Sequence, residues 1–134
     1  MSALSDYLEN KIADHILGGG DFTRPATVYV ALFTAGPTDA GGGTEVSGNG
    51  YARAAVTNNG TNVPAASGGQ KSNGTVITFG GGATGTWGTV THFAIYDATT
   101  SGNLLLHGAL TTAKLIESGD TPSFPIGTLV FSFN

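Results

Sequence analysis

Glycine is the feature that most limits how this chain can fold, because it supplies 22 of the 134 residues and often stands in clusters. Glycine weakens the interior of helices and strands and is the usual residue of tight turns. Clusters at 18–20, 41–43 and 80–82 therefore divide the chain into short segments. Between them, β-branched and aromatic residues favour strands. We expect a mainly β fold, either a β-sandwich or a jelly-roll-like antiparallel domain, with one N-terminal α-helix.

The length of the chain predicts one domain over residues 1–134. Within it we expect an N-terminal helix and glycine hinge at 1–20, followed by a β-sandwich at 21–134. The chain has no cysteine. Its absence excludes a disulfide framework, a thiolate nucleophile and a cysteine-based zinc site.

Residues 3–17 have the pattern of a helix, since apolar residues recur at every fourth position. Ser2 can cap its start, and the glycines at 18–20 can end it. The stripe must be buried against something, because an isolated helix of this length is marginal in water. It can pack on its own sheet or on a neighbouring subunit, and the glycine hinge favours the neighbour. We therefore predict a partner contact formed by Leu4, Tyr7, Leu8, Ile12 and Ile16.

Beyond Pro25 the apolar periodicity changes from that of a helix to that of strands. Two glycine-rich loops, 34–50 and 58–74, are long enough to be functional or mobile, and contact with neighbouring subunits is one use for them. A five-residue hairpin loop is expected at 98–102. The predicted strands are 27–33, 51–57, 75–79, 89–97, 103–110, 114–116 and 128–133.

The charge pattern excludes two classes of partner. A formal net charge of −4 has the wrong sign for binding phosphates, and the five basic residues are scattered, so nucleic acid is not expected as a ligand. No apolar run is long enough to span a bilayer, and no cationic region precedes the first apolar positions. We therefore expect neither a membrane span nor a signal peptide.

Two glycine motifs resemble nucleotide-binding loops without meeting their structural requirements. The spacing of Gly80, Gly82 and Gly85 matches a dinucleotide fingerprint, but strand-forming residues follow where a helix is needed. Residues 68–72 resemble the end of a phosphate-binding loop, yet Gln70 replaces a required glycine. We expect no cofactor.

His92 and His107 are the strongest candidates for a metal or catalytic site. The predicted hairpin places them almost opposite each other on adjacent strands. Two histidines need a third ligand to hold a metal, and Asp97 lies at the far end of the hairpin. His15 is expected to be solvated or interfacial. We predict no metal site and no catalytic residues, so the chain is not expected to be an enzyme.

Three stretches together resemble a family of small tailed-bacteriophage proteins that is commonly labelled as tail fibre protein. They are 4–12, then 25–34 continuing to 44–53, and 87–97 leading to 103–112. The resemblance as a whole covers about three quarters of the chain. The loop 58–74 lies outside the resemblance. The resemblance implies a structural protein of the virion, assembled in the cytoplasm of the bacterial host.

Physical considerations narrow the role within the virion. A fibre shaft needs coiled coil, repeats or an intertwined β-helix, and this sequence has room for none of them. We expect a surface decoration or cement protein that binds a major capsid or tail protein in symmetric copies, with a homotrimer preferred. A tail fibre or baseplate adaptor is the alternative. A carbohydrate-binding module that uses Trp87 and the tyrosines is a further hypothesis.

Overall fold

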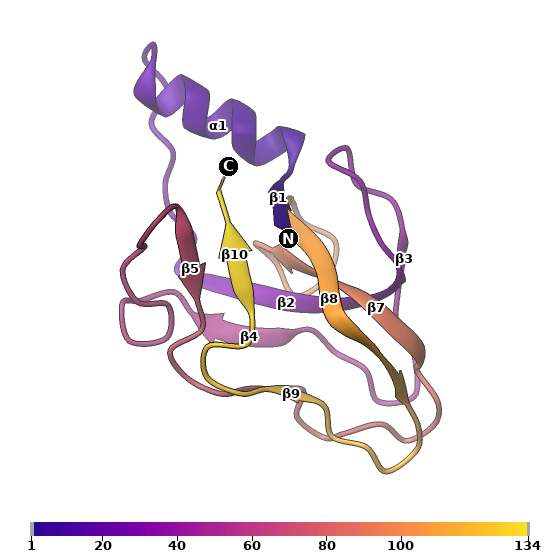
Figure 1. Ribbon diagram of the computed structural model, residues 1–134. Coiled ribbons are helices and arrows are strands. Elements are labelled where there is room, and N and C mark those ends of the chain that lie inside the picture. The colour runs from indigo at the N-terminus through magenta and orange to yellow at the C-terminus, as the bar shows by residue number, and fades with distance from the viewer. Residues whose placement is uncertain (1, 134) are drawn as a thin grey trace.

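The computed structural model describes residues 2–133, and its largest element is an antiparallel sheet (Figure 1). The central pair of strands, β2 and β7, carries further strands on both sides. At one edge of β2, β3 and β4 pair with different parts of the same strand. The order across the sheet is β1 (Ser2–Leu4), β8 (Leu104–Ile116), β7 (Gly88–Tyr96), β2 (Thr27–Ala35) and β3 (Thr44–Glu45), with β4 (Ala54–Thr57) also on β2.

Two short antiparallel pairs form a second layer. They are β5 (Gln70–Ser72) with β10 (Val130–Ser132), and β6 (Ile77–Thr78) with β9 (Ser123–Phe124). The ring of Phe131 from this layer meets Phe93 of the large sheet edge-on, with centroids 6.0 Å apart. The main apolar core therefore lies between the layers, and the prediction of a mainly β, sandwich-like fold with one N-terminal helix is confirmed.

Strand β2 is buried on both faces, as its apolar sequence predicts. Val30 and Leu32 point into the main core, whereas Ala31 and Phe33 belong to a smaller cluster on the opposite face. The segment after β2 runs close to that face, since a Cβ on Gly36 would lie 2.5 Å from the ring of His92. A segment expected to be a loop, 34–50, thus covers part of the sheet.

The helix begins later than predicted. The helix α1 spans Asp6–Ile16, and its N-cap is Ser5, whose hydroxyl accepts a hydrogen bond from Leu8 N–H at 3.1 Å. The prediction of Ser2 as the cap and Leu4 as part of the helical stripe is wrong. Residues 2–4 instead form β1, because their backbone groups pair with the edge of β8. Sequence periodicity alone does not reveal this pairing.

The strand boundaries differ from the prediction where pairing is distant in sequence. The predicted strands 103–110 and 114–116 are one strand, β8, which pairs with β7. The predicted 51–57, 75–79 and 128–133 are shorter in the structure. Strands β3, β5 and β9 were not predicted at all, since each has only two or three residues.

Candidate interaction surface

The N-terminal helix lies against its own sandwich. Leu8 is buried in the main core with 7% of its surface exposed, and Tyr7 and Ile12 are partly buried against that core. Leu4 packs on the same core from β1. In this structure the glycines at 18–20 therefore do not release the helix from its own sandwich. The predicted contact of the stripe with a partner stays a prediction.

The end of the helix is different, since its apolar side chains face solvent. Ile16 is 69% exposed and Leu17 is 79% exposed. We refer to these two residues as the helix tip. Gly18 follows with φ of +129°, which favours glycine, and the chain then turns back toward the sandwich. In Figure 1 this end of α1 lies apart from the strands.

The returning segment is tied to the helix by one hydrogen bond. Phe22 N–H donates to Nδ1 of His15 at 3.2 Å. His15 also lies 3.9 Å from the carboxylate of Asp21, which is almost fully exposed. His15 is thus a surface residue that orders the turn after the helix, which is compatible with the expected solvated position.

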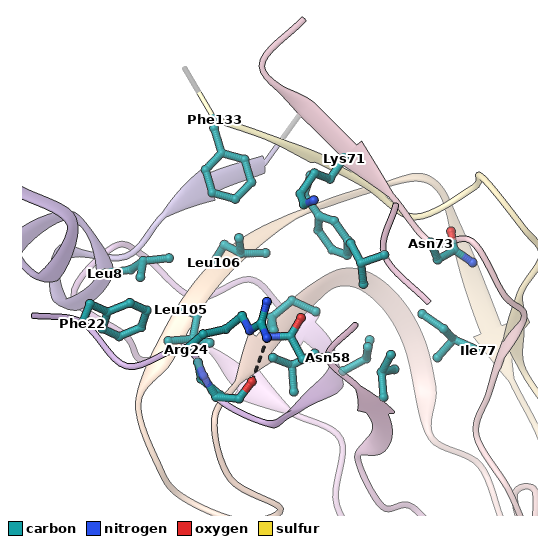
Figure 2. Close-up of a pocket in the computed structure, with 17 residues that line it drawn as sticks. Leu8, Phe22, Arg24, Asn58, Lys71, Asn73, Ile77, Leu105, Leu106 and Phe133 are labelled. Carbon is teal, nitrogen blue, oxygen red and sulfur yellow. Dashed lines mark hydrogen bonds between the residues drawn. The ribbon is translucent and has the colours of Figure 1, made fainter. Parts of the chain in front are cut away.

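An apolar cavity of about 250 Å³ opens between the helix, the returning segment and the two layers. In Figure 2, Leu8 and Phe22 form one side, and Ile77 lies at the other. Arg24 and Lys71 bring two positive charges to its lining. The walls are otherwise mostly aliphatic and aromatic, and they include Val28, Val30, Val56, Val63, Ile95, Leu105, Leu106, Phe131 and Phe133.

Most polar groups of the cavity are already occupied. Asn58 Nδ2 donates to the carbonyl of Pro25 at 2.8 Å, and Lys71 Nζ donates to that of Pro64 at 2.8 Å. Asn73 is 1% exposed and bonds only backbone groups. Arg24 is exposed, and none of the ion pairs among residues 2–133 includes it. The cavity is therefore a mainly apolar site with two cations in its lining, of which Lys71 already makes one bond within the protein.

His92 and His107 do not lie opposite each other, contrary to the prediction. His92 pairs with Ala109, and His107 pairs with Ala94, so the two histidines are offset along the strands. His107 Nε2 lies 2.8 Å from Oδ1 of Asp39. Within residues 2–133, no group of three His, Asp or Glu side chains is placed to hold a metal ion.

The glycine motif at 80–85 lies in the turn region between β6 and β7, and none of residues 86–133 is in a helix. Gly82 has φ of +66°, and a Cβ there would approach Oγ1 of Thr121 at 2.8 Å. Ala83 N–H donates to the carbonyl of Asp120 at 2.8 Å. These glycines permit close packing of two turns.

Trp87 does not form an exposed platform for sugars. It is 5% exposed, its Nε1 donates to the carbonyl of Asn49 at 2.9 Å, and its ring meets Tyr51 edge-on. A carbohydrate-binding module needs an exposed aromatic face, so the hypothesis that Trp87 binds carbohydrate is wrong.

Sequence reasoning missed a charged network on the far face of the large sheet. Arg53 donates from Nε and Nη2 to the carboxylate of Glu45, at 2.9 and 2.8 Å. Its Nη1 donates to the carbonyls of Ala98 and Ser101, and its guanidinium stacks on Tyr96 at 3.7 Å from the ring centroid. The hydrogen bond with Glu45 raises the pKa of Arg53. Two of these partners, Ala98 and Ser101, belong to the hairpin loop at 98–102, so the network anchors that loop.

Tyr51 completes this network from the core side. Its hydroxyl donates to Oε2 of Glu45 at 2.7 Å and accepts from Leu32 N–H at 3.0 Å. Burial raises the pKa of Tyr51 well above its ordinary value, because desolvation disfavours the phenolate. The only sequence signal for this network is that Glu45 and Arg53 lie near each other along the chain, and this proximity does not specify a contact between them.

Among residues 2–133, no helix is both long and apolar enough to cross a membrane. Residues 3–132 match a family model described as podophage GP4 fiber I protein gp80. No curated protein matches the chain. The family match covers nearly all of the described residues, including the loop 58–74 that the sequence resemblance left out.

Proposed function

The chain belongs to the podophage GP4 fiber I protein gp80 family, and from this premise we propose that it is a globular subunit of a fibre on the phage particle. Membership makes it a structural protein of a phage virion, which is a non-enzymatic kind of protein. The family match over residues 3–132 is the observation that carries the proposal, because it includes both layers of the sandwich and the helix.

The fold supports a head domain over a shaft. The longest helix among residues 2–133 has 11 residues, and the sheet has no repeating unit there. A shaft needs an extended coiled coil or repeated β-structure. Other virion proteins are the expected partners, and a homotrimer is the expected state in solution. Since only 10% of the residues are charged, apolar contacts rather than ion pairs would hold such an assembly together.

Decoration or cementing of the capsid is the second candidate. The absence of a shaft in the described residues favours it, because a compact domain of this kind can bridge neighbouring capsomers. A baseplate adaptor would use the same compactness at the tail. These roles differ in where the protein sits on the particle.

Cryo-electron microscopy of the virion tests the proposal directly. We expect density fitted by the sandwich at an appendage attached to the tail, with antibody labelling at the same place. Density over the capsid lattice would overturn the fibre role in favour of decoration. Absence of the protein from purified particles by mass spectrometry would overturn a virion role altogether.

A further inference from the structure

Two features remain unexplained by the proposed function: the exposed helix tip and the apolar cavity. We propose that the helix tip of one copy inserts into the cavity of a second copy of this chain. This inference rests on the proposed function, since it gives the expected homo-oligomer its contact. It is a head-to-tail contact, because the surface that one copy offers, the helix tip, is not the surface that the other copy offers, the cavity.

The helix tip has the properties of a donor. Ile16 and Leu17 are adjacent and are the two most exposed of the large apolar residues in the described chain. They lie at the end of α1 that stands apart from the strands in Figure 1. A single exposed apolar residue is ordinary, but two together on a projecting turn form a patch that is able to bury itself in a partner.

The cavity has the size and the walls to receive these side chains. A cavity of about 150 Å³ lined by aliphatic and aromatic residues can bind a molecule as large as benzene. The cavity here measures about 250 Å³. It therefore has room for two branched aliphatic side chains. Its walls, which include Val63, Leu106 and Phe133, offer no competing hydrogen bonds to such a guest.

The charges beside the two features are complementary, and this favours a second copy as the occupant. Asp14 and Asp21 are exposed and flank the helix tip in the sequence. Arg24 and Lys71 lie at the cavity. The ammonium of Lys71 has three donors, of which the bond to Pro64 uses one. Insertion of the tip would therefore bring two carboxylates to two cations around an apolar centre.

A head-to-tail contact either closes into a ring or continues as an open filament. Each copy offers one tip and one cavity, so a ring of three would satisfy every site and would be the homotrimer proposed above. The contact also explains why the helix end can remain apolar without being covered by its own domain.

The test compares two single variants and their mixture. Leu17→Asp disables the tip, and Arg24→Glu disables the mouth of the cavity. We expect each to weaken self-association of the full chain at least tenfold by light scattering and analytical ultracentrifugation. Their equimolar mixture should form dimers that do not grow, because one intact tip then meets one intact cavity. The control is Leu115→Asp, an exposed residue of β8 whose replacement should leave assembly unchanged.

A charge exchange tests the orientation. Asp21→Arg introduced into the Arg24→Glu variant should restore at least part of the lost association. Circular dichroism and thermal unfolding establish that each variant is folded. If Arg24→Glu dissociates the oligomer while Leu17→Asp does not, another segment occupies the cavity and the proposal is wrong. An anionic amphiphile found bound in the cavity by native mass spectrometry would also overturn it.

The outcomes separate this inference from the proposed function. A wild-type chain that is monomeric at all concentrations, yet present in an appendage of the virion, would overturn the tip contact and retain the fibre role. Tip-dependent oligomers of a protein that is absent from purified particles would retain the contact and overturn the virion role.

Discussion

Ser2 and Ser132 bond each other across 130 positions of sequence. Ser132 N–H donates to Oγ of Ser2 at 2.6 Å, and the Ser2 hydroxyl donates to the carbonyl of Ser132 at 3.3 Å. Both residues are buried. The pair joins β1 of the large sheet to β10 of the second layer, so the two layers are connected at this point by hydrogen bonds as well as by the core.

The first prediction concerns this pair. Ser2→Ala removes the acceptor of a buried N–H and should reduce the free energy of unfolding by about 1–3 kcal/mol, the cost of an unsatisfied buried donor. Urea denaturation measures the change. Ser47→Ala, at an exposed serine, is the control and should have little effect. Equal midpoints for the two variants would show that the Ser2 bonds do not stabilise the fold.

The second prediction separates the buried and exposed parts of the helix stripe. Leu8→Ala should lower the free energy of unfolding by about 2–5 kcal/mol, because it removes apolar contacts and enlarges a cavity. Ile16→Ala should change it by less than about 0.5 kcal/mol, since that side chain is mostly exposed. Chemical denaturation of both variants as monomers is the measurement. A small effect of Leu8→Ala would mean that the helix is not docked on its own sandwich in solution.

The third prediction concerns Asn73, which is the buried polar centre of the second layer. Its Nδ2 donates to the carbonyls of Thr75, Phe124 and Pro125, and its Oδ1 accepts from Leu129 N–H at 3.0 Å. Asn73→Ala should cost about 3 kcal/mol or more, because several backbone groups lose their partner together. Asn10→Ala on the exposed face of the helix serves as the control. Thermal unfolding that is equal for the two variants would contradict this role.

The fourth prediction is a loss of stability at alkaline pH. Burial raises the pKa of Tyr51 above that of an unfolded tyrosine, which is about 10. The neutral phenol therefore stabilises the fold fully below about pH 10, and this contribution decreases as the pH rises further, because the unfolded state releases the proton first. Burial shifts the pKa of Tyr96 in the same direction.

The Tyr51→Phe variant tests this dependence. It should be less stable at pH 7, since Leu32 N–H and Glu45 lose a partner, but its free energy of unfolding should fall less steeply between pH 9 and about pH 11. Tyr7→Phe, which removes the hydroxyl of a partly buried tyrosine outside this network, is the matched control. Identical slopes for Tyr51→Phe and wild type would contradict the assignment.

The elements that the sequence predicted well are those with a strong local signal. Strand β2 is apolar at nearly every position, and the helix has regular periodicity and a glycine stop. The predicted start of the helix was wrong because the backbone groups of residues 2–4 form hydrogen bonds with β8 instead of extending the helix. No local pattern in the sequence shows this pairing. The strands β3 and β5 were missed for the same reason, since each exists only through a partner strand.

The candidate site was only partly predictable. In the sequence, Leu8 and Ile16 have equivalent positions in the apolar stripe. In the structure Leu8 is buried and Ile16 is exposed, because the sandwich contacts only part of the helix. The cavity brings together residues from α1, seven strands and several connecting segments, so no spacing in the sequence marks it. Arg53 was visible as one of few cations, but its partners at 98 and 101 are backbone carbonyls, which carry no sequence signal.

The pairing of β1 with β8 has a consequence for the order of events during synthesis. Ser2 pairs with Gly108, so the first strand cannot be placed until the ribosome has released most of the chain. Contacts this distant in sequence slow folding, because a large loop must close before they form. The helix that follows β1 is fixed on the sandwich at the same late stage. A nascent chain therefore cannot hold the helix in its final position before the residues of β8 are available to pair with β1.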